Sequence, residues 1–295
     1  MRCLRILMVL AFTVSAVWAC AADTAKLREV YIFKGDDPAL DGIELGSWGG
    51  GSASKSKERI LDRSWSVKIT IQGLYAGGRM DFTRPVTLLA DGIDDSRYIQ
   101  FAFFVMDTKT VNPAAGTIYD WEVEPYTIPT TGKIRFVFES DKGVTVSAEQ
   151  PTRKIDPDDN WMRIAVPLAR FKVNEDLEEF RLKRLLVMSD LPTTMYLGEM
   201  KLLTDKTPIT VESLGIQAMA IMDEVLWVPE TDGGVSCLKY SWDFDARNGI
   251  QSESDAMIGR YVYTEGGTYT VTLTVSDLDG LKAPVTVSTT IDISG

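Results

Sequence analysis

The 295-residue sequence contains no histidine, and this absence bears on several classes of function. Without histidine the chain has no serine–histidine or cysteine–histidine pair, lacks the commonest general base and offers no imidazole ligand for zinc. The sequence motifs of phosphate-binding loops, nucleophile elbows, zinc proteases and Cys-x-x-Cys sites are missing as well. We therefore expect a protein that is not an enzyme.

Positive charge is also scarce. Lys and Arg number 31 against 42 Asp and Glu, which gives a formal net charge of -11. Because an acidic chain repels phosphate groups, we expect neither nucleic acid nor an anionic membrane surface as a partner. An acidic surface does suit calcium ions, and it also serves solubility alone.

Long apolar runs are confined to the N-terminus. Residues 6–18 form an apolar run behind two arginines, and this run is shorter than the ~20 residues that a membrane-spanning helix needs. Ala19 and Ala21 follow with the spacing of a signal-peptidase site, which predicts a signal peptide over residues 1–21. We therefore expect a secreted, extracellular or periplasmic protein whose mature chain has no transmembrane segment.

Cysteine is rare, with 3 in the chain. Because Cys3 and Cys20 lie in or beside the predicted signal peptide, Cys237 is left alone and no intramolecular disulfide is expected. We expect Cys237 to be a small buried apolar residue. Residues 17–20 loosely resemble a lipobox, so the alternative to free secretion is a lipid anchor on Cys20.

Alternation of apolar and polar residues with a period of two dominates the remaining sequence and predicts β-strands. The run at residues 98–106 is apolar on both faces, which predicts a central strand covered on both sides. Strands are predicted at residues 30–33, 65–72, 98–106, 133–138, 144–147, 162–166, 181–188, 196–203, 269–276 and 285–293. Helix is limited to one predicted turn at residues 176–180, capped by Asn174. The predicted fold is all-β and built from sandwiches.

The character of the sequence changes after the predicted strand at residues 196–203. Residues 204–208 have the composition of a short linker, and the sequence beyond them is rich in Thr and Val. We therefore expect two β-sandwich domains, at residues 25–205 and 209–295.

The C-terminal part carries a specific pattern. Tyr-Ser-Trp-Asp-Phe-Asp at residues 240–245 is followed by Tyr-Val-Tyr-Thr-Glu-Gly-Gly-Thr-Tyr-Thr-Val-Thr-Leu-Thr-Val-Ser-Asp at residues 261–277 and by Asp-Gly at residues 279–280. In order and spacing this pattern closely resembles the PKD (polycystic kidney disease) domain family over residues 209–295. The resemblance implies an immunoglobulin-like sandwich, an extracellular setting and a role as spacer or interaction module, and it implies no reaction. We expect Trp242 to be the core tryptophan between the two sheets.

Four strand-like runs shape the N-terminal part, and they lie at residues 65–71, 73–82, 98–101 and 196–202. Their layout is similar to that of the galactose-binding-like jelly rolls of carbohydrate-binding modules. The resemblance implies a jelly-roll-like β-sandwich, and it implies a polysaccharide or a cell-surface glycan as the partner.

Both resemblances imply candidate calcium ligands. Jelly-roll binding modules often hold a structural calcium where the first and last strands approach, which makes Asp36, Asp41 and Glu199 one candidate set. In some PKD relatives acidic residues near the Trp-Asp-Phe turn bind calcium, and Asp243 and Asp245 form the second set. The alternative for each carboxylate is a place in a turn, solvated or hydrogen-bonded to the backbone.

Sugar binding requires exposed aromatic faces beside polar groups. Trp48 is the first candidate, because the glycines of residues 46–51 leave its ring accessible. Tyr75, Trp121 and Tyr126 are further candidates because they lie near turn residues. The alternative is that these aromatic side chains pack at sheet edges.

The sequence thus predicts a secreted or cell-surface binding protein that recognises carbohydrate through its N-terminal sandwich. The first alternative is a structural or adhesion protein of the cell envelope without a small ligand. The second alternative is a carboxylate-based glycosidase, or a lyase that uses tyrosine and arginine. A glycosidase would need a cleft with two carboxylates about 5–9.5 Å apart.

Overall fold

The computed structural model describes residues 29–89, 96–115, 123–172, 179–215 and 217–295. The predicted signal peptide with Cys20, the candidate Trp121 and the cap residue Asn174 lie outside these ranges. The described chain is almost entirely strand, with two short 3-10 helices, which confirms the all-β prediction. Among the described residues no helix is both long and apolar enough to cross a bilayer.

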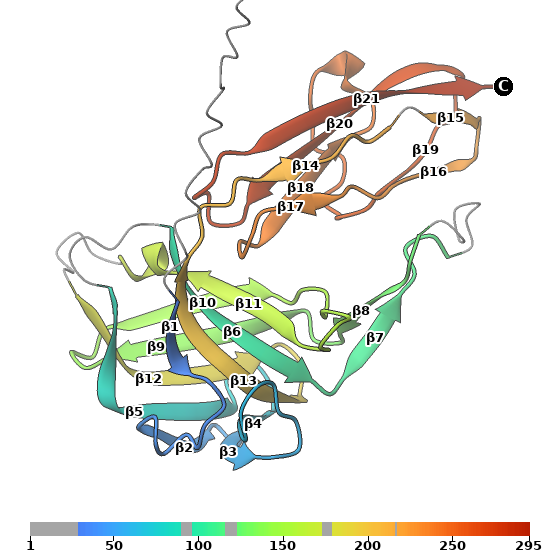
Figure 1. Ribbon diagram of the computed structural model, residues 1–295. Helices are drawn as coiled ribbons and strands as arrows, with labels where there is room; N and C mark the ends of the chain where they lie inside the picture. The colour runs from blue at the N-terminus through green and yellow to red at the C-terminus, as the bar shows by residue number, and fades with distance from the viewer. Residues whose placement is uncertain (1–28, 90–95, 116–122, 173–178, 216) are drawn as a thin grey trace, which may run out of the picture.

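The N-terminal sandwich consists of two antiparallel sheets that face each other (Figure 1). The six-stranded sheet contains β1 (Val30–Phe33), β3 (Ser52–Ser56), β4 (Ser66–Ile71), β6 (Arg97–Val105), β11 (Met162–Pro167) and β13 (Thr193–Thr204). The five-stranded sheet contains, in spatial order, β10 (Thr145–Pro151), β9 (Lys133–Ser140), β12 (Phe180–Ser189), β5 (Gly77–Leu89) and β2 (Ile43–Trp48). The first strand β1 pairs with the last strand β13, as expected of a jelly-roll-like sandwich.

The core between these sheets follows from the alternation in the sequence. Phe101 and Phe103 of β6 and Phe136 and Phe138 of β9 are fully buried, and the Phe101 and Phe136 ring centroids lie 4.5 Å apart. The other face of β6 is covered by a smaller cluster around Trp161. The prediction of a central strand covered on both sides is confirmed, and such burial supplies most of the driving force for folding.

The predicted helical turn at residues 176–180 is wrong at its C-terminal end. Phe180 instead opens strand β12 and is fully buried. Its ring packs edge-to-face on Phe171, at a centroid distance of 4.9 Å. Burial in the sandwich therefore overrides the local capping signal.

The C-terminal domain is a smaller set of sheets. It contains β14 (Thr210–Val211), β15 (Gln217–Ala220), β16 (Glu224–Trp227), β17 (Thr231–Asp232), β18 (Leu238–Asp243), β19 (Gly259–Val262), β20 (Gly267–Asp277) and β21 (Val285–Ser294). Trp242 is fully buried, as predicted, and its ring stacks on Phe244 at 5.8 Å with an interplanar angle of 6°. Cys237 is a free thiol and 5% exposed, which confirms its expected character.

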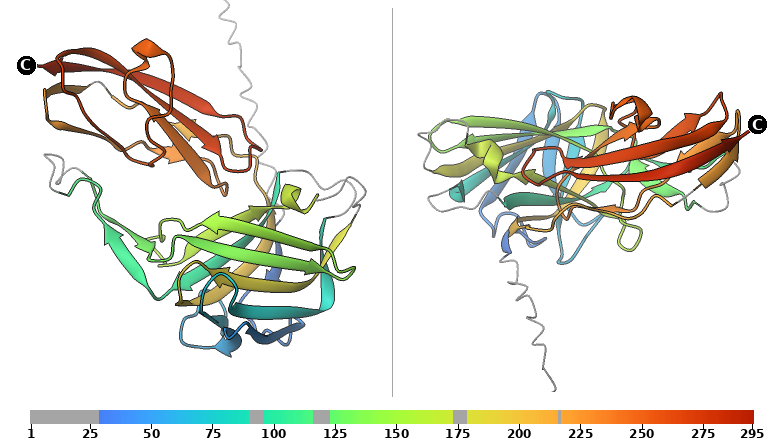
Figure 2. Two further views of the ribbon diagram at one scale, coloured as in Figure 1. Left: turned by 180° about the vertical axis from the view of Figure 1, so that it is seen from behind. Right: turned by 90° about the horizontal axis from the view of Figure 1, so that it is seen from above.

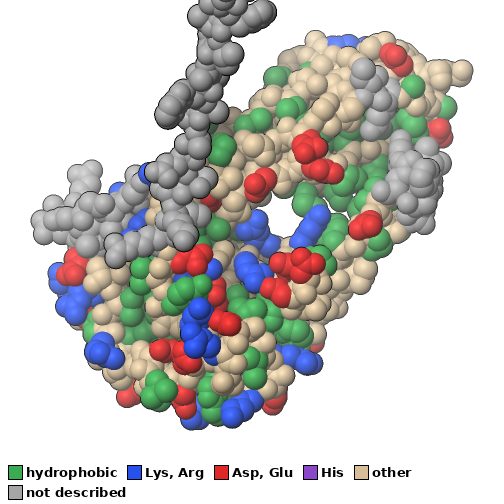
Figure 3. Space-filling view, viewed as in Figure 1, with side chains coloured by type: hydrophobic (Ala, Val, Ile, Leu, Met, Phe, Trp, Pro, Cys, Tyr) green, Lys and Arg blue, Asp and Glu red, His purple; other side chains and the backbone are tan. Residues whose placement is uncertain are grey.

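The two domains lie against each other rather than at the ends of an extended linker (Figure 2). The Lys282 Nζ atom lies 2.7 Å from the Asp205 Oδ2 atom, with both side chains nearly buried. The Tyr98 hydroxyl lies 3.0 Å from the Ser236 Oγ atom in a buried contact. These contacts join the end of the N-terminal sandwich to loops of the C-terminal domain. Figure 3 shows an opening between the two domains with charged side chains around it.

A two-stranded arm projects from the N-terminal sandwich beside the C-terminal domain (Figure 1). Strands β7 (Thr108–Val111) and β8 (Tyr126–Pro129) form it as an antiparallel pair. The sequence analysis did not predict these two short strands.

Candidate functional site

Two neighbouring turns at the end of the five-stranded sheet expose the strongest aromatic candidates. Trp48 ends strand β2 and is 42% exposed. Tyr75 lies in the turn between β4 and β5 and is 74% exposed. Large aromatic side chains normally bury most of their surface, so two exposed rings on adjacent turns make this a candidate binding surface.

Glycines bring these two turns together. Gly49 has φ +56°, and a side chain there would place its Cβ atom 2.4 Å from the Tyr75 carbonyl oxygen. A Cβ atom at Gly51 would lie 2.4 Å from the Gly77 Cα atom. Only glycine permits such close approach of two backbones. The glycines therefore hold the Trp48 turn against the Tyr75 turn, a role that the sequence analysis did not assign to them.

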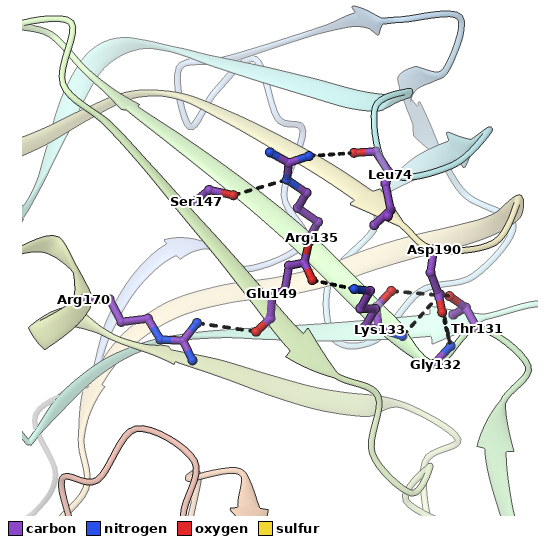
Figure 4. A network of polar contacts seen from close by, with 9 residues as sticks. All are labelled: Leu74, Thr131, Gly132, Lys133, Arg135, Ser147, Glu149, Arg170 and Asp190. Carbon is purple, nitrogen blue, oxygen red and sulfur yellow. Dashed lines mark hydrogen bonds and ion pairs between the residues drawn. The ribbon is translucent and has the colours of Figure 1, made fainter.

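Arg135 of strand β9 fastens the Tyr75 turn from the side (Figure 4). Its Nη1 atom donates to the Leu74 carbonyl oxygen at 3.3 Å, and its Nε atom donates to the Ser147 Oγ atom at 3.2 Å. The guanidinium carbon lies 5.0 Å from the centre of the Tyr75 ring, within the range of a cation–π contact. We refer to Trp48, Tyr75 and Arg135 as the Trp48–Tyr75 surface.

The strand register places Trp48 and Arg135 on one row across four adjacent strands. Trp48 pairs with Gly77 between β2 and β5, and Met188 pairs with Arg135 between β12 and β9. Gly78 pairs with Val187, so Gly77 lies beside Met188. Three strand spacings of about 4.8 Å put roughly 14 Å between the ends of the row.

A polar network continues from this surface along β9 and β10 (Figure 4). The Lys133 Nζ atom lies 2.6 Å from the Glu149 Oε2 atom. The Asp190 carboxylate accepts hydrogen bonds from Thr131 and from the backbone N–H groups of Gly132 and Lys133. Partial burial raises the pKa of Asp190, but these hydrogen bonds outweigh it and hold the pKa below its usual value. Both carboxylates are therefore held in structural contacts.

Tyr126 does not belong to the Trp48–Tyr75 surface. It lies on the β7–β8 arm, where the Lys154 Nζ atom is 4.1 Å from the centre of its ring. Burial raises the pKa of its hydroxyl, and the nearby Tyr240 of the C-terminal domain adds to the increase. Its position between the domains indicates a packing role, which is the alternative that the sequence analysis left open.

The first calcium set is not brought together. Among the described residues no three carboxylates form a group that could hold a metal ion. Glu199 instead lies 3.1 Å from the Lys201 Nζ atom. Burial raises the pKa of Asp41, and the charge of Asp36 raises it further, so these two carboxylates do lie near each other. Glu199, however, has a lysine as its partner.

The second calcium set is accounted for by the turn after β18. The buried Asp243 carboxylate accepts hydrogen bonds from the backbone N–H groups of Asp245 and Gln251, at 2.9 and 2.6 Å. The Arg247 guanidinium binds the Asp245 carboxylate and holds its pKa below the usual value. Both side chains therefore stabilise the turn, which is the alternative to calcium binding given above for these carboxylates.

Arg135 is the member of the surface that the sequence analysis missed. The alternation of residues 133–138 places Lys133, Arg135 and Val137 on the outward face of β9, so the exposure of Arg135 was predictable. Its proximity to Tyr75 was not, because the two residues belong to strands and turns that are distant in the sequence.

Comparison with known proteins defines the class of the C-terminal domain. Residues 224–293 match the family described as PKD domain, so the C-terminal domain is an immunoglobulin-like domain of the PKD type. No curated protein matches the chain. Among solved structures, the chain is similar to the M60 catalytic domain with the CBM51-1 and CBM51-2 domains from Clostridium perfringens ZmpB. The identity is 14% and the TM-score is 0.25. The match covers 90% of this chain and 23% of the solved chain, so this chain spans less than a quarter of the length of the solved one.

Proposed function

We propose that this protein is a secreted or cell-surface binding protein that recognises carbohydrate without chemically altering it. The Trp48–Tyr75 surface is its binding surface. The single observation that carries this proposal is the exposure of two aromatic rings on turns that glycines hold together. Aromatic rings of this kind stack on the apolar faces of sugar rings, while polar groups beside them bind hydroxyls.

The clefts of the described chain favour binding over hydrolysis. A cleft of about 420 Å³ lies at the domain boundary, and its one carboxylate, Asp205, is bound to Lys282. A second cleft of about 510 Å³ contains Glu149 and Asp190. Glu149 pairs with Lys133, and the pKa of Asp190 is lowered, whereas a glycosidase acid needs a raised pKa.

The PKD domain acts in this proposal as a partner that holds the sandwich in a fixed orientation. Its Lys282 and Ser236 contact Asp205 and Tyr98 of the N-terminal sandwich. A domain fixed in this way presents the Trp48–Tyr75 surface in one direction, which a flexible spacer would not do.

The test is a binding measurement on the full chain with a panel of immobilised polysaccharides. For any polysaccharide that binds, Trp48→Ala and Tyr75→Ala are expected to weaken binding by about tenfold or more, since exposed aromatic anchors dominate such surfaces. Tyr31→Ala is the matched control, because Tyr31 is also 40% exposed but lies on the six-stranded sheet. It should leave the affinity unchanged.

Two results would contradict the proposal. The first is that no polysaccharide in the panel binds the full chain, which would favour a structural or adhesion role. The second is that Trp48→Ala and Tyr31→Ala behave alike, which would place binding elsewhere on the protein.

A further inference from the structure

Arg135 differs in its partners from four other basic residues of the five-stranded sheet, which are bound to carboxylates. Arg79 and Arg184 lie within 3 Å of Asp81, and Lys133 lies 2.6 Å from Glu149. Arg181 lies 3.3 Å from Asp141. In the part of the chain that the structure describes, Arg135 has no carboxylate partner; it bonds to a backbone carbonyl and a hydroxyl instead.

The position of Arg135 places this positive charge beside an exposed aromatic ring. Its guanidinium lies against the Tyr75 ring, which is 74% exposed. A guanidinium carries five N–H donors, and the two hydrogen bonds of Arg135 leave several of them for a ligand. A planar guanidinium binds carboxylate and sulfate oxygens through paired hydrogen bonds, and such charge-assisted bonds are stronger than neutral ones.

The row between Arg135 and Trp48 adds no competing charge. Its intermediate positions are Gly77, which has no side chain, and Met188, which is 2% exposed. A sugar chain lying along the row would therefore meet an aromatic ring at Trp48 and a positive charge beside Tyr75.

We propose that the Trp48–Tyr75 surface selects acidic polysaccharide, with the Arg135 guanidinium bound to a carboxylate or sulfate group of the sugar chain. This inference rests on the proposed function and names its ligand class. The whole chain carries a formal net charge of -11, which repels polyanions in general. Affinity for an acidic glycan therefore has to come from a local contact, and Arg135 supplies it.

The test uses the full chain and two probes that share one backbone. Polygalacturonate carries the carboxylates, and its fully methyl-esterified form carries none. Wild type should bind polygalacturonate about tenfold more tightly or better, because a hydrogen-bonded charge contributes at least that much. Dextran sulfate and dextran form a second pair and separate sulfate from carboxylate recognition.

Three variants sharpen this measurement. Arg135→Gln should lower the affinity for the acidic probe far more than the affinity for the esterified probe, so that the ratio between the two affinities falls toward one. Arg135→Lys should retain part of the preference, since it keeps the charge but loses the planar donors. Arg181→Gln is the matched control on the same sheet, because Arg181 already has Asp141 as its partner. Thermal unfolding of each variant establishes that the fold is intact.

The outcomes separate the two proposals. If wild type binds both members of each pair equally, or if Arg135→Gln keeps the preference, the inference is overturned. The proposed function would still stand as long as Trp48→Ala weakens binding by about tenfold or more. If none of these probes nor any other polysaccharide binds, the proposed function fails and the inference fails with it.

Discussion

The contact between Lys282 and Asp205 is the feature of the domain boundary whose removal has the largest expected effect. The two side chains are 9% and 3% exposed and their charged atoms lie 2.7 Å apart. Asp205 also accepts hydrogen bonds from the backbone N–H groups of Val235 and Thr207, both at 2.9 Å. Lys282 donates a further bond to the Gly233 carbonyl oxygen at 2.6 Å.

Asp205→Asn keeps the shape of the side chain and removes its charge, which leaves the Lys282 ammonium buried without a counterion. Removal of one partner from a buried ion pair costs roughly 3–5 kcal/mol. At about 2–4 °C for each kcal/mol in a protein of this size class, the midpoint of thermal unfolding should fall by roughly 10 °C. Because the pair joins two domains, calorimetry should also show two separated transitions for the variant.

Two further variants decide whether the ion pair is the cause. Asp62→Asn removes an exposed carboxylate that lies 3.6 Å from Lys34, and it should change stability by less than about 1 kcal/mol. The double variant Asp205→Asn with Lys282→Met should recover much of the loss, since no buried charge remains unpaired. An Asp205→Asn protein that melts within a degree of wild type would refute this reasoning.

The same pair predicts a dependence on pH. Burial raises the pKa of Asp205, but the hydrogen bonds from Lys282 and from Thr207 outweigh it and lower the pKa below its usual value. A carboxyl group with a lowered folded-state pKa stabilises the protein above its unfolded pKa of about 3.9, and this contribution is lost as the pH falls through the folded pKa. The difference in melting temperature between wild type and Asp205→Asn should therefore be largest near neutral pH and should decrease below about pH 4.

Three other outcomes are expected from the structure. Gly49→Ala would place its Cβ atom 2.4 Å from the Tyr75 carbonyl oxygen, so it should lower the free energy of unfolding by about 1–3 kcal/mol and weaken glycan binding. A variant that binds glycan with the affinity of wild type would contradict the role of the two turns. Trp242→Ala removes a fully buried indole and should lower the free energy of unfolding, measured with denaturant, by roughly 3–5 kcal/mol. An unchanged free energy of unfolding would contradict the core position of Trp242. Cys237 is 5% exposed and burial raises the pKa of its thiol, so a thiol reagent should label it only after unfolding.

Local pattern accounts for most of the longer strands, and particular residues show why. Phe136 and Phe138 alternate with polar neighbours, so their burial follows from the period of a strand. The outward position of Arg135 follows from the same rule. Trp242 was predictable as a core residue because the PKD pattern around it is specific. These features depend on neighbours close in the sequence.

The partners of those strands depend on contacts between distant segments and were not predictable. Arg135 meets the carbonyl oxygen of Leu74, 61 residues earlier in the chain. Asp205 meets Lys282 across a separation of 77 residues. A single sequence does not reveal which distant segments lie together, because pairing depends on the packing of the whole sandwich. The first calcium set combined carboxylates that are distant in the sequence, whereas the ion pair of Glu199 is local, with Lys201 two residues along the same strand.

The most direct test of carbohydrate recognition by the Trp48–Tyr75 surface compares the full-length wild type with the Trp48→Ala/Tyr75→Ala double variant on one polysaccharide array under the same conditions. We predict that wild type binds a defined set of polysaccharides and that acidic ones bind most strongly. The double variant should bind none of them while unfolding at a similar temperature. Wild-type binding that survives in the double variant would contradict the assignment of the Trp48–Tyr75 surface. An array without any wild-type binding would contradict carbohydrate recognition itself.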